Sequence, residues 1–277
     1  MGFLDIFKGK RPELSVTADP AEPTPGGEVR VRVVVEGEID KKARGARAGI
    51  RCVNDYLTKE WDRQDDEWDT VWRAVSMHED AQDLPLQAGE HEFTFRVPDG
   101  LPPESAEAVS WWAWANIDRE GGFDAKASIR MPVRLPASAV PSEKRSIPPG
   151  KDGVGFEDLP ASAGGNQPLE GVITVTPEED VKAQGVKVKL SRHCRYHDDD
   201  HKLERNKDVV EVEVAGPQEL AAGQTHQFPF SFVVPVNPGP TAQAPHSVVE
   251  WTITGIVARR MKLDLEQREP IVVYDGP

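Results

Sequence analysis

The chain has 277 residues, and its 33 Lys and Arg against 47 Asp and Glu leave a net charge of −14 at pH 7. A protein this acidic is repelled by polyanions, so we do not expect it to bind DNA, RNA or anionic bilayers. The length suits two domains, while 24 Pro and 23 Gly favour short elements joined by many turns, so we expect an all-β chain.

Residues 1–11 form a short amphipathic segment with apolar residues at Phe3, Leu4, Ile6 and Phe7. This segment lacks the apolar core and cleavage site of a signal peptide, and it is short and only weakly basic for a membrane anchor. The chain has no run of 18 apolar residues, and its two cysteines lie one in each half, which is not the disulfide framework of a small secreted domain. We expect a cytoplasmic protein that touches membranes, if at all, through residues 1–10.

Residues 12–135 show the alternating pattern of strands that bury one face. Valines occupy every second position from Val29 to Val35, with arginines between them. The turn Leu86–Gly89 leads into apolar residues at every second position of 93–97, and Val109–Val133 has the pattern of two strands joined by a tight turn. These residues predict an N-terminal β-sandwich that ends in a hairpin.

Residues 54–80 allow two interpretations. Trp61, Trp68 and Trp72 are spaced by seven and four residues, which could place them on one face of a helix. The alternative is a hairpin with a polar tip at Arg63–Glu67, followed by a strand over Thr70–Met77. We favour the hairpin because an all-β sandwich has a place for it.

Trp112 and Trp114 lie on the face of their predicted strand opposite to Trp111. Two large aromatic side chains on the outward side are either covered by another part of the chain or exposed as a contact patch. If exposed, they are the candidate anchors for a binding partner, because Trp is a frequent hot-spot residue.

Residues 136–167 have the composition of a Pro/Gly-rich linker, with Pro148-Pro149-Gly150 and few β-branched residues. The alternating pattern resumes at Leu169, and residues 168–277 predict a second β-sandwich. The predicted organisation is therefore a segment over 1–11, a sandwich over 12–135, a linker over 136–167 and a second sandwich over 168–277.

An internal repeat supports two equivalent domains. The stretch Val109–Val133 returns as Val249–Val273, 140 residues later and without a gap. Five positions keep their residue type, among them Trp111 and Trp251, and others keep their apolar character. We therefore expect two tandem immunoglobulin-like β-sandwiches built on the same plan.

His193, His197 and His201 form the one cluster with the chemistry of metal ligands. They would share one face of a helix, where they could bind Zn²⁺ or another divalent ion. In a strand, residues four apart are ~13 Å from each other, which is too far to share one ion without a turn between them. The chain has no Gly-x-Ser-x-Gly, Gly-rich phosphate-binding or His-Glu-x-x-His motif.

Several motifs resemble a known superfamily. The C-terminal half has a Gly turn, a Phe-Pro-Phe strand, a Pro-rich connection and a long hairpin, at Leu220–Gly223, Phe228–Phe232, Pro235 and Val249–Trp251. This arrangement resembles the arrestin-like superfamily, and the first half is similar but looser. With the turn Pro25–Gly27, the chain looks most like the bacterial sporulation-control (M-type) family. The resemblance implies two tandem arrestin-type sandwiches that bind other proteins and do no chemistry.

From these observations we expect a non-catalytic cytoplasmic adaptor or scaffold that binds other proteins and has no cofactor. Its expected role is to regulate development or stress responses. Its candidate partner-binding residues are Trp112 and Trp114. One alternative is a carbohydrate- or small-ligand-binding module that uses the same aromatic residues as a stacking platform. The other is a metal-dependent enzyme that uses the cluster of His193, His197 and His201.

Overall fold

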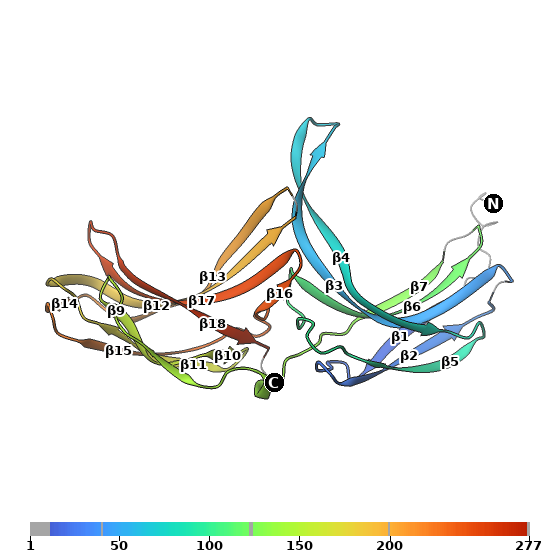
Figure 1. Cartoon of the computed structure of the whole chain (residues 1–277), viewed down its shortest axis with the longest axis horizontal. Helices are drawn as coiled ribbons and strands as arrows, with labels where there is room; N and C mark the ends of the chain where they lie inside the picture. Colours follow the sequence, from blue (N-terminus) through green and yellow to red (C-terminus); the bar gives the residue numbers. More distant parts are fainter. Residues whose placement is uncertain (1–11, 40, 122–123, 199, 276–277) are drawn as a thin grey trace, which may run out of the picture. The chain divides into compact units, whose positions relative to one another are not determined.

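The computed structural model describes residues 12–39, 41–121, 124–198 and 200–275 (Figure 1). Strands β1 to β18 make up almost all of the regular structure there, with one short 3-10 turn at Ala137–Ala139. No helix in this part of the chain is long and apolar enough to cross a membrane. The predicted all-β class is confirmed, while the amphipathic segment expected at 1–11 lies outside the described residues.

The chain divides into two compact units. The first takes in the described residues up to Asp55 together with Arg73–Glu104 and Val109–Arg134. The second takes in Tyr56–Trp72, Ser105–Ala108 and the described residues from Leu135 onward. Each unit has its own pair of sheets, as expected for two sandwiches.

The first unit contains a three-stranded sheet and most of a four-stranded sheet, while the hairpin tip of that second sheet, within Tyr56–Trp72, is grouped with the second unit. The valines of β2 that alternate from Val29 to Val35 are buried, as are Trp111, Ala113, Ala115 and Ile117 of β6. These two apolar faces form the core. The three-stranded sheet has the order β1 (Glu13–Asp19), β2 (Glu28–Glu36), β5 (Gly89–Arg96), and the four-stranded sheet β4 (Glu67–Asp83), β3 (Ala43–Asp62), β6 (Val109–Arg119), β7 (Ala125–Arg130).

The second unit contains a seven-stranded and a four-stranded sheet. The larger one follows the path β10 (Ser162–Gly164), β18 (Leu265–Tyr274), β17 (Ser247–Arg259), β12 (Val181–His197), β13 (Lys202–Ala215), with β14 (Gln218–Leu220) on β12 and β16 (Ala242–Ala244) on β17. The smaller one has the order β15 (His226–Val233), β11 (Pro168–Val175), β9 (Val154–Pro160), β8 (Lys144–Ile147). β10 runs parallel to β18.

Matching hydrogen bonds show that the hairpins β6–β7 and β17–β18 are two copies of one unit. The indole of Trp111 donates to the carbonyl of Pro102 at 3.0 Å, and the indole of Trp251 donates to the carbonyl of Gly239 at 3.0 Å. Both rings are fully buried. Each hairpin also has a carboxylate in its turn that accepts a hydrogen bond from a backbone N–H. Asp124 accepts from Arg119, and Asp264 accepts from Arg259. The predicted duplication is confirmed by this geometry.

Residues 54–80 form the hairpin β3–β4, so the helix alternative for Trp61, Trp68 and Trp72 was wrong. β4 is the last strand of its sheet, and most of its residues are exposed on both faces. A helix would have needed a continuous apolar face to bury. The three indoles instead remain about half exposed, at 45%, 54% and 46%.

The segment 136–167, where we expected a linker, carries strands β8, β9 and β10 of the second unit. Phe156 and Leu159 of β9 are fully buried. Gly153 has φ +71°, and a Cβ on Gly155 would lie 2.5 Å from the carbonyl oxygen of Ile147. Gly153 therefore allows a tight turn, and Gly155 allows two strands to approach closely. The same glycines gave this segment the composition of a linker.

Candidate functional site

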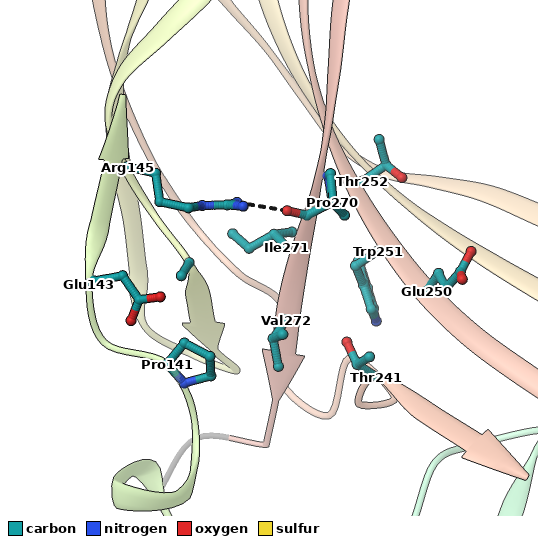
Figure 2. A pocket seen from close by; sticks show the side chains of 11 residues that line it. Pro141, Glu143, Arg145, Thr241, Glu250, Trp251, Thr252, Pro270, Ile271 and Val272 are labelled. Carbon is teal, nitrogen blue, oxygen red and sulfur yellow. Dashed lines mark hydrogen bonds between the residues drawn. The ribbon is translucent and has the colours of Figure 1, made fainter. Parts of the chain in front are cut away.

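A groove of about 400 Å³ opens in the second unit between the segment that leads into β8 and the β17–β18 hairpin (Figure 2). We call it the seam groove. Its lining is largely apolar and includes the buried Trp251 and Ile271, with Pro141, Ala161, Pro270 and Val272. Concave, mostly apolar sites with a few polar groups are the usual form of binding pockets.

A side-chain hydrogen bond crosses the seam groove. Arg145 of β8 donates from its guanidinium to the backbone carbonyl of Pro270 in β18 at 2.8 Å, which Figure 2 shows as a dashed line. β10 pairs with β18 only over Ser162–Gly164, opposite residues 272–274. Pro270 has no N–H to offer to a further strand, so it is suited to a sheet edge. The wall and the hairpin therefore meet here through the Arg145 side chain and through a backbone hydrogen bond from Val272 to the carbonyl of Ala161 at 3.1 Å, and the groove lies beside these contacts.

The rim of the seam groove is acidic. Glu143 is exposed, and its carboxylate has no hydrogen bond or ion pair with any described residue. Glu250 lies on the other wall and is paired with Arg195 at 2.6 Å, with both side chains half exposed. A ligand with an apolar side chain next to a cationic one would fit this site, because the apolar group would contact the floor and the cation would pair with the carboxylate of Glu143.

The predicted anchors Trp112 and Trp114 are both only partly exposed. The indole of Trp112 donates to the hydroxyl of Ser110 at 3.1 Å, and the guanidinium carbon of Arg130 lies 4.9 Å from its ring centre. Trp114 lines a second cavity, of about 290 Å³, in the first unit. A partner-binding role for these two residues stays a prediction.

The structure does not gather the predicted metal ligands into one site. His193 and His197 lie on β12, where His193 is bonded to the Asn206 amide at 3.0 Å. His201 precedes β13 and lies 3.5 Å from the carboxylate of Asp198. Within the described ranges, no group of three His, Cys, Asp or Glu is placed to hold a metal ion. The extended spacing of β12 keeps its histidines apart.

The hydrogen bond from Thr58 lowers the pKa of Asp198 to about 2, and the backbone N–H groups of His201 and Asp200 add to this effect. The carboxylate beside His201 therefore stays ionised at neutral pH. The hydrogen bond from the backbone N–H of His201 to Asp198 holds His201 in this turn.

Sequence reasoning missed the seam groove and undervalued the hairpin tip. The groove wall at Pro141–Arg145 falls in the segment assigned to a linker, and no local motif marks it. Trp61 and Trp68 lie edge to face, 5.5 Å between ring centres, and Trp68 also lies 5.2 Å from the ring of His201. The sequence feature that could have identified this hairpin tip is the presence of three Trp residues among carboxylates at a predicted turn.

Both cysteines are free and buried, so we expect them to be unreactive in the native protein. Burial, helped by the nearby carboxylates of Glu104 and Asp55, raises the pKa of Cys52 to about 12, and burial also raises the pKa of Cys194. The thiolate, which is the reactive form, is therefore scarce at neutral pH. Titration with Ellman's reagent at pH 7.5 is expected to detect two thiols in guanidinium chloride and almost none without it. Rapid reaction of either thiol in the native protein would contradict this.

Comparison with known proteins finds a family match for most of the second unit. The family model described as SpoOM protein matches residues 161–275. A search of solved structures finds the sporulation control protein Spo0M from Bacillus subtilis, with 18% identity and a TM-score of 0.38 over 45% of this chain and 48% of that chain. A search of curated proteins finds no match. Over residues 161–275 this chain is SpoOM-like, which confirms the family resemblance predicted from its sequence.

Proposed function

We propose that the chain is a non-catalytic cytoplasmic adaptor that binds an extended segment of a partner protein in the seam groove. The observation that carries this proposal is the apolar groove with the unpaired carboxylate of Glu143 on its rim. The SpoOM-like character of the same unit supports a binding role over a catalytic one, as the family resemblance implies. A part in regulating development, such as sporulation control, or stress responses stays a prediction.

The groove defines the chemistry of the segment. Its volume of about 400 Å³ accommodates one large apolar side chain against Ile271 and Trp251. A Lys or Arg next to that anchor would meet Glu143, and the net charge of −14 favours a basic partner. β8 is the last strand of its sheet, and no described strand pairs with its outer edge. An extended chain could add to this edge as in other strand-addition complexes.

The proposal predicts a charge requirement. Peptides selected from a random library on the purified protein are expected to carry an apolar residue beside Lys or Arg. Glu143→Lys is expected to weaken their binding about tenfold in fluorescence anisotropy, because it replaces attraction by repulsion at the rim. The matched control is Glu178→Lys, which makes the same charge change at an exposed turn before β12.

A second variant separates the groove from the general charge of the protein. Thr252 lies on the β17 wall and is partly exposed, so Thr252→Trp fills the groove without removing a buried group. This variant is expected to abolish binding of the selected peptides. If the peptides bind Thr252→Trp and Glu143→Lys as tightly as they bind the wild-type protein, their site is elsewhere and the proposal is wrong.

A further inference from the structure

The second cavity, of about 290 Å³, lies in the first unit on the sheet β4-β3-β6-β7. We call it the sheet-face pocket. All four strands contribute polar side chains to its lining: Arg51 from β3, Glu79 from β4, Trp114 and Asn116 from β6, and Lys126 and Ser128 from β7. The register places Trp114 opposite Ser128 and Asn116 opposite Lys126, so these side chains lie on one face of the sheet.

A glycine allows β4 to form one wall of this pocket. Gly49 of β3 is buried and lies opposite Trp114 in the sheet register. A Cβ at this position would be 2.2 Å from the carbonyl oxygen of Asp80 and 3.0 Å from Ala81. The main chain of β4 therefore passes over Gly49, which brings Glu79 to the pocket beside Arg51.

Several polar groups in the pocket have no partner in the described chain. Arg51 is partly buried and makes no hydrogen bond or ion pair there, and its Nε has no contact with solvent. The indole N–H of Trp114 and the amide oxygen of Asn116 are also buried without a partner. Buried polar groups are almost always hydrogen-bonded, so this cluster is exceptional in one small volume.

The charges in the pocket are mixed. Glu79 is exposed and has no ion pair in the described part of the chain, and it does not pair with Arg51. The ammonium group of Lys126 is already held 3.3 Å from the carboxylate of Asp124. One unpaired cation and one unpaired anion thus face the same volume. A ligand with both charges can pair with both groups, whereas an anion or a cation alone pairs with only one of them.

We propose that the sheet-face pocket binds a small zwitterion that carries a carboxylate and an amino or quaternary ammonium group. The carboxylate accepts hydrogen bonds from the guanidinium of Arg51, which lines the pocket. The cationic group pairs with Glu79, and Trp114 lines the same pocket, where an indole ring can attract a cation. A cavity of about 290 Å³ matches a ligand of amino-acid size.

Isothermal titration calorimetry of the full chain tests this inference with glycine, β-alanine, γ-aminobutyrate and glycine betaine as zwitterions. Acetate and butylamine carry the single charges. At least one zwitterion is expected to bind about tenfold more tightly than either single-charge probe. Arg51→Gln and Glu79→Gln are each expected to weaken that binding about tenfold. Arg30→Gln and Glu28→Gln make the same charge changes on exposed sites of β2 and are expected to leave it unchanged.

Three results would overturn the inference. The first is no saturable heat from any zwitterion up to about 10 mM. The second is acetate binding as tightly as the best zwitterion with Glu79→Gln unaffected, which would indicate a simple anion site. The third is equal losses in the β2 controls. Since Glu79 is exposed, Glu79→Gln keeps the fold, and its result stands even if Arg51→Gln proves unstable by circular dichroism.

Discussion

Trp251→Ala is expected to lower the free energy of unfolding of the second unit by about 3–5 kcal/mol. The indole is 1% exposed and lies opposite Ile271 in the β17–β18 register, so its removal leaves a large cavity in the core. The change also leaves the carbonyl of Gly239 without its donor. Urea denaturation of the variant, followed by circular dichroism, measures this loss.

Trp251→Phe is the matched control for that variant. It keeps an aromatic ring in the core but removes the indole N–H, so its expected loss is smaller, about 1–2 kcal/mol. Trp111→Ala should produce a loss of similar size in the first unit, because Trp111 has the same burial and the same type of carbonyl acceptor. A Trp251→Ala protein no less stable than Trp251→Phe would show that core burial is not what this position provides.

Gly49→Ala is expected to destabilise the first unit by about 1–3 kcal/mol, because the added Cβ meets the backbone of β4 and not a flexible side chain. Relief of the clash requires β4 to move away from β3. Hydrogen–deuterium exchange is therefore expected to rise in residues 73–83, together with a lower melting temperature. Gly45→Ala on the same strand is the control, since its Cβ would meet nothing within 4 Å. Equal exchange in the two variants would contradict the proposed approach of β4.

The sequence predicted the repeated architecture because alternation and turn residues are local signals. The valines of β2 show which face is buried, and the shared spacing of Trp111 and Trp251 shows that the hairpin occurs twice. The structure adds the matched carbonyl acceptors of the two indoles. Those acceptors are nine and twelve residues away in loops, where no residue pattern identifies them.

The candidate sites could not be predicted in the same way, because they depend on contacts between distant residues. The seam groove requires Arg145 to meet Pro270, 125 positions later. The sheet-face pocket requires β4 to cross Gly49, and one glycine in a strand does not indicate what lies above it. The strands at 144–164 were also hidden, since short strands between Gly and Pro turns have the composition of a linker.

The terminal position of β4 also bears on the solubility of the chain. The segment Val71–Met77, apolar except for Arg73 and Ser76, lies in the terminal strand of its sheet and is rich in residues that favour cross-β stacking. Carboxylates bracket this run, with Glu67 and Asp69 before it and Glu79, Asp80 and Asp83 after it. They act as gatekeepers, because copies of the strand that approach edge to edge must bring like charges together. Near the sequence pI of about 5.0 the net charge of the whole chain vanishes, and this protection against fibril growth weakens with it.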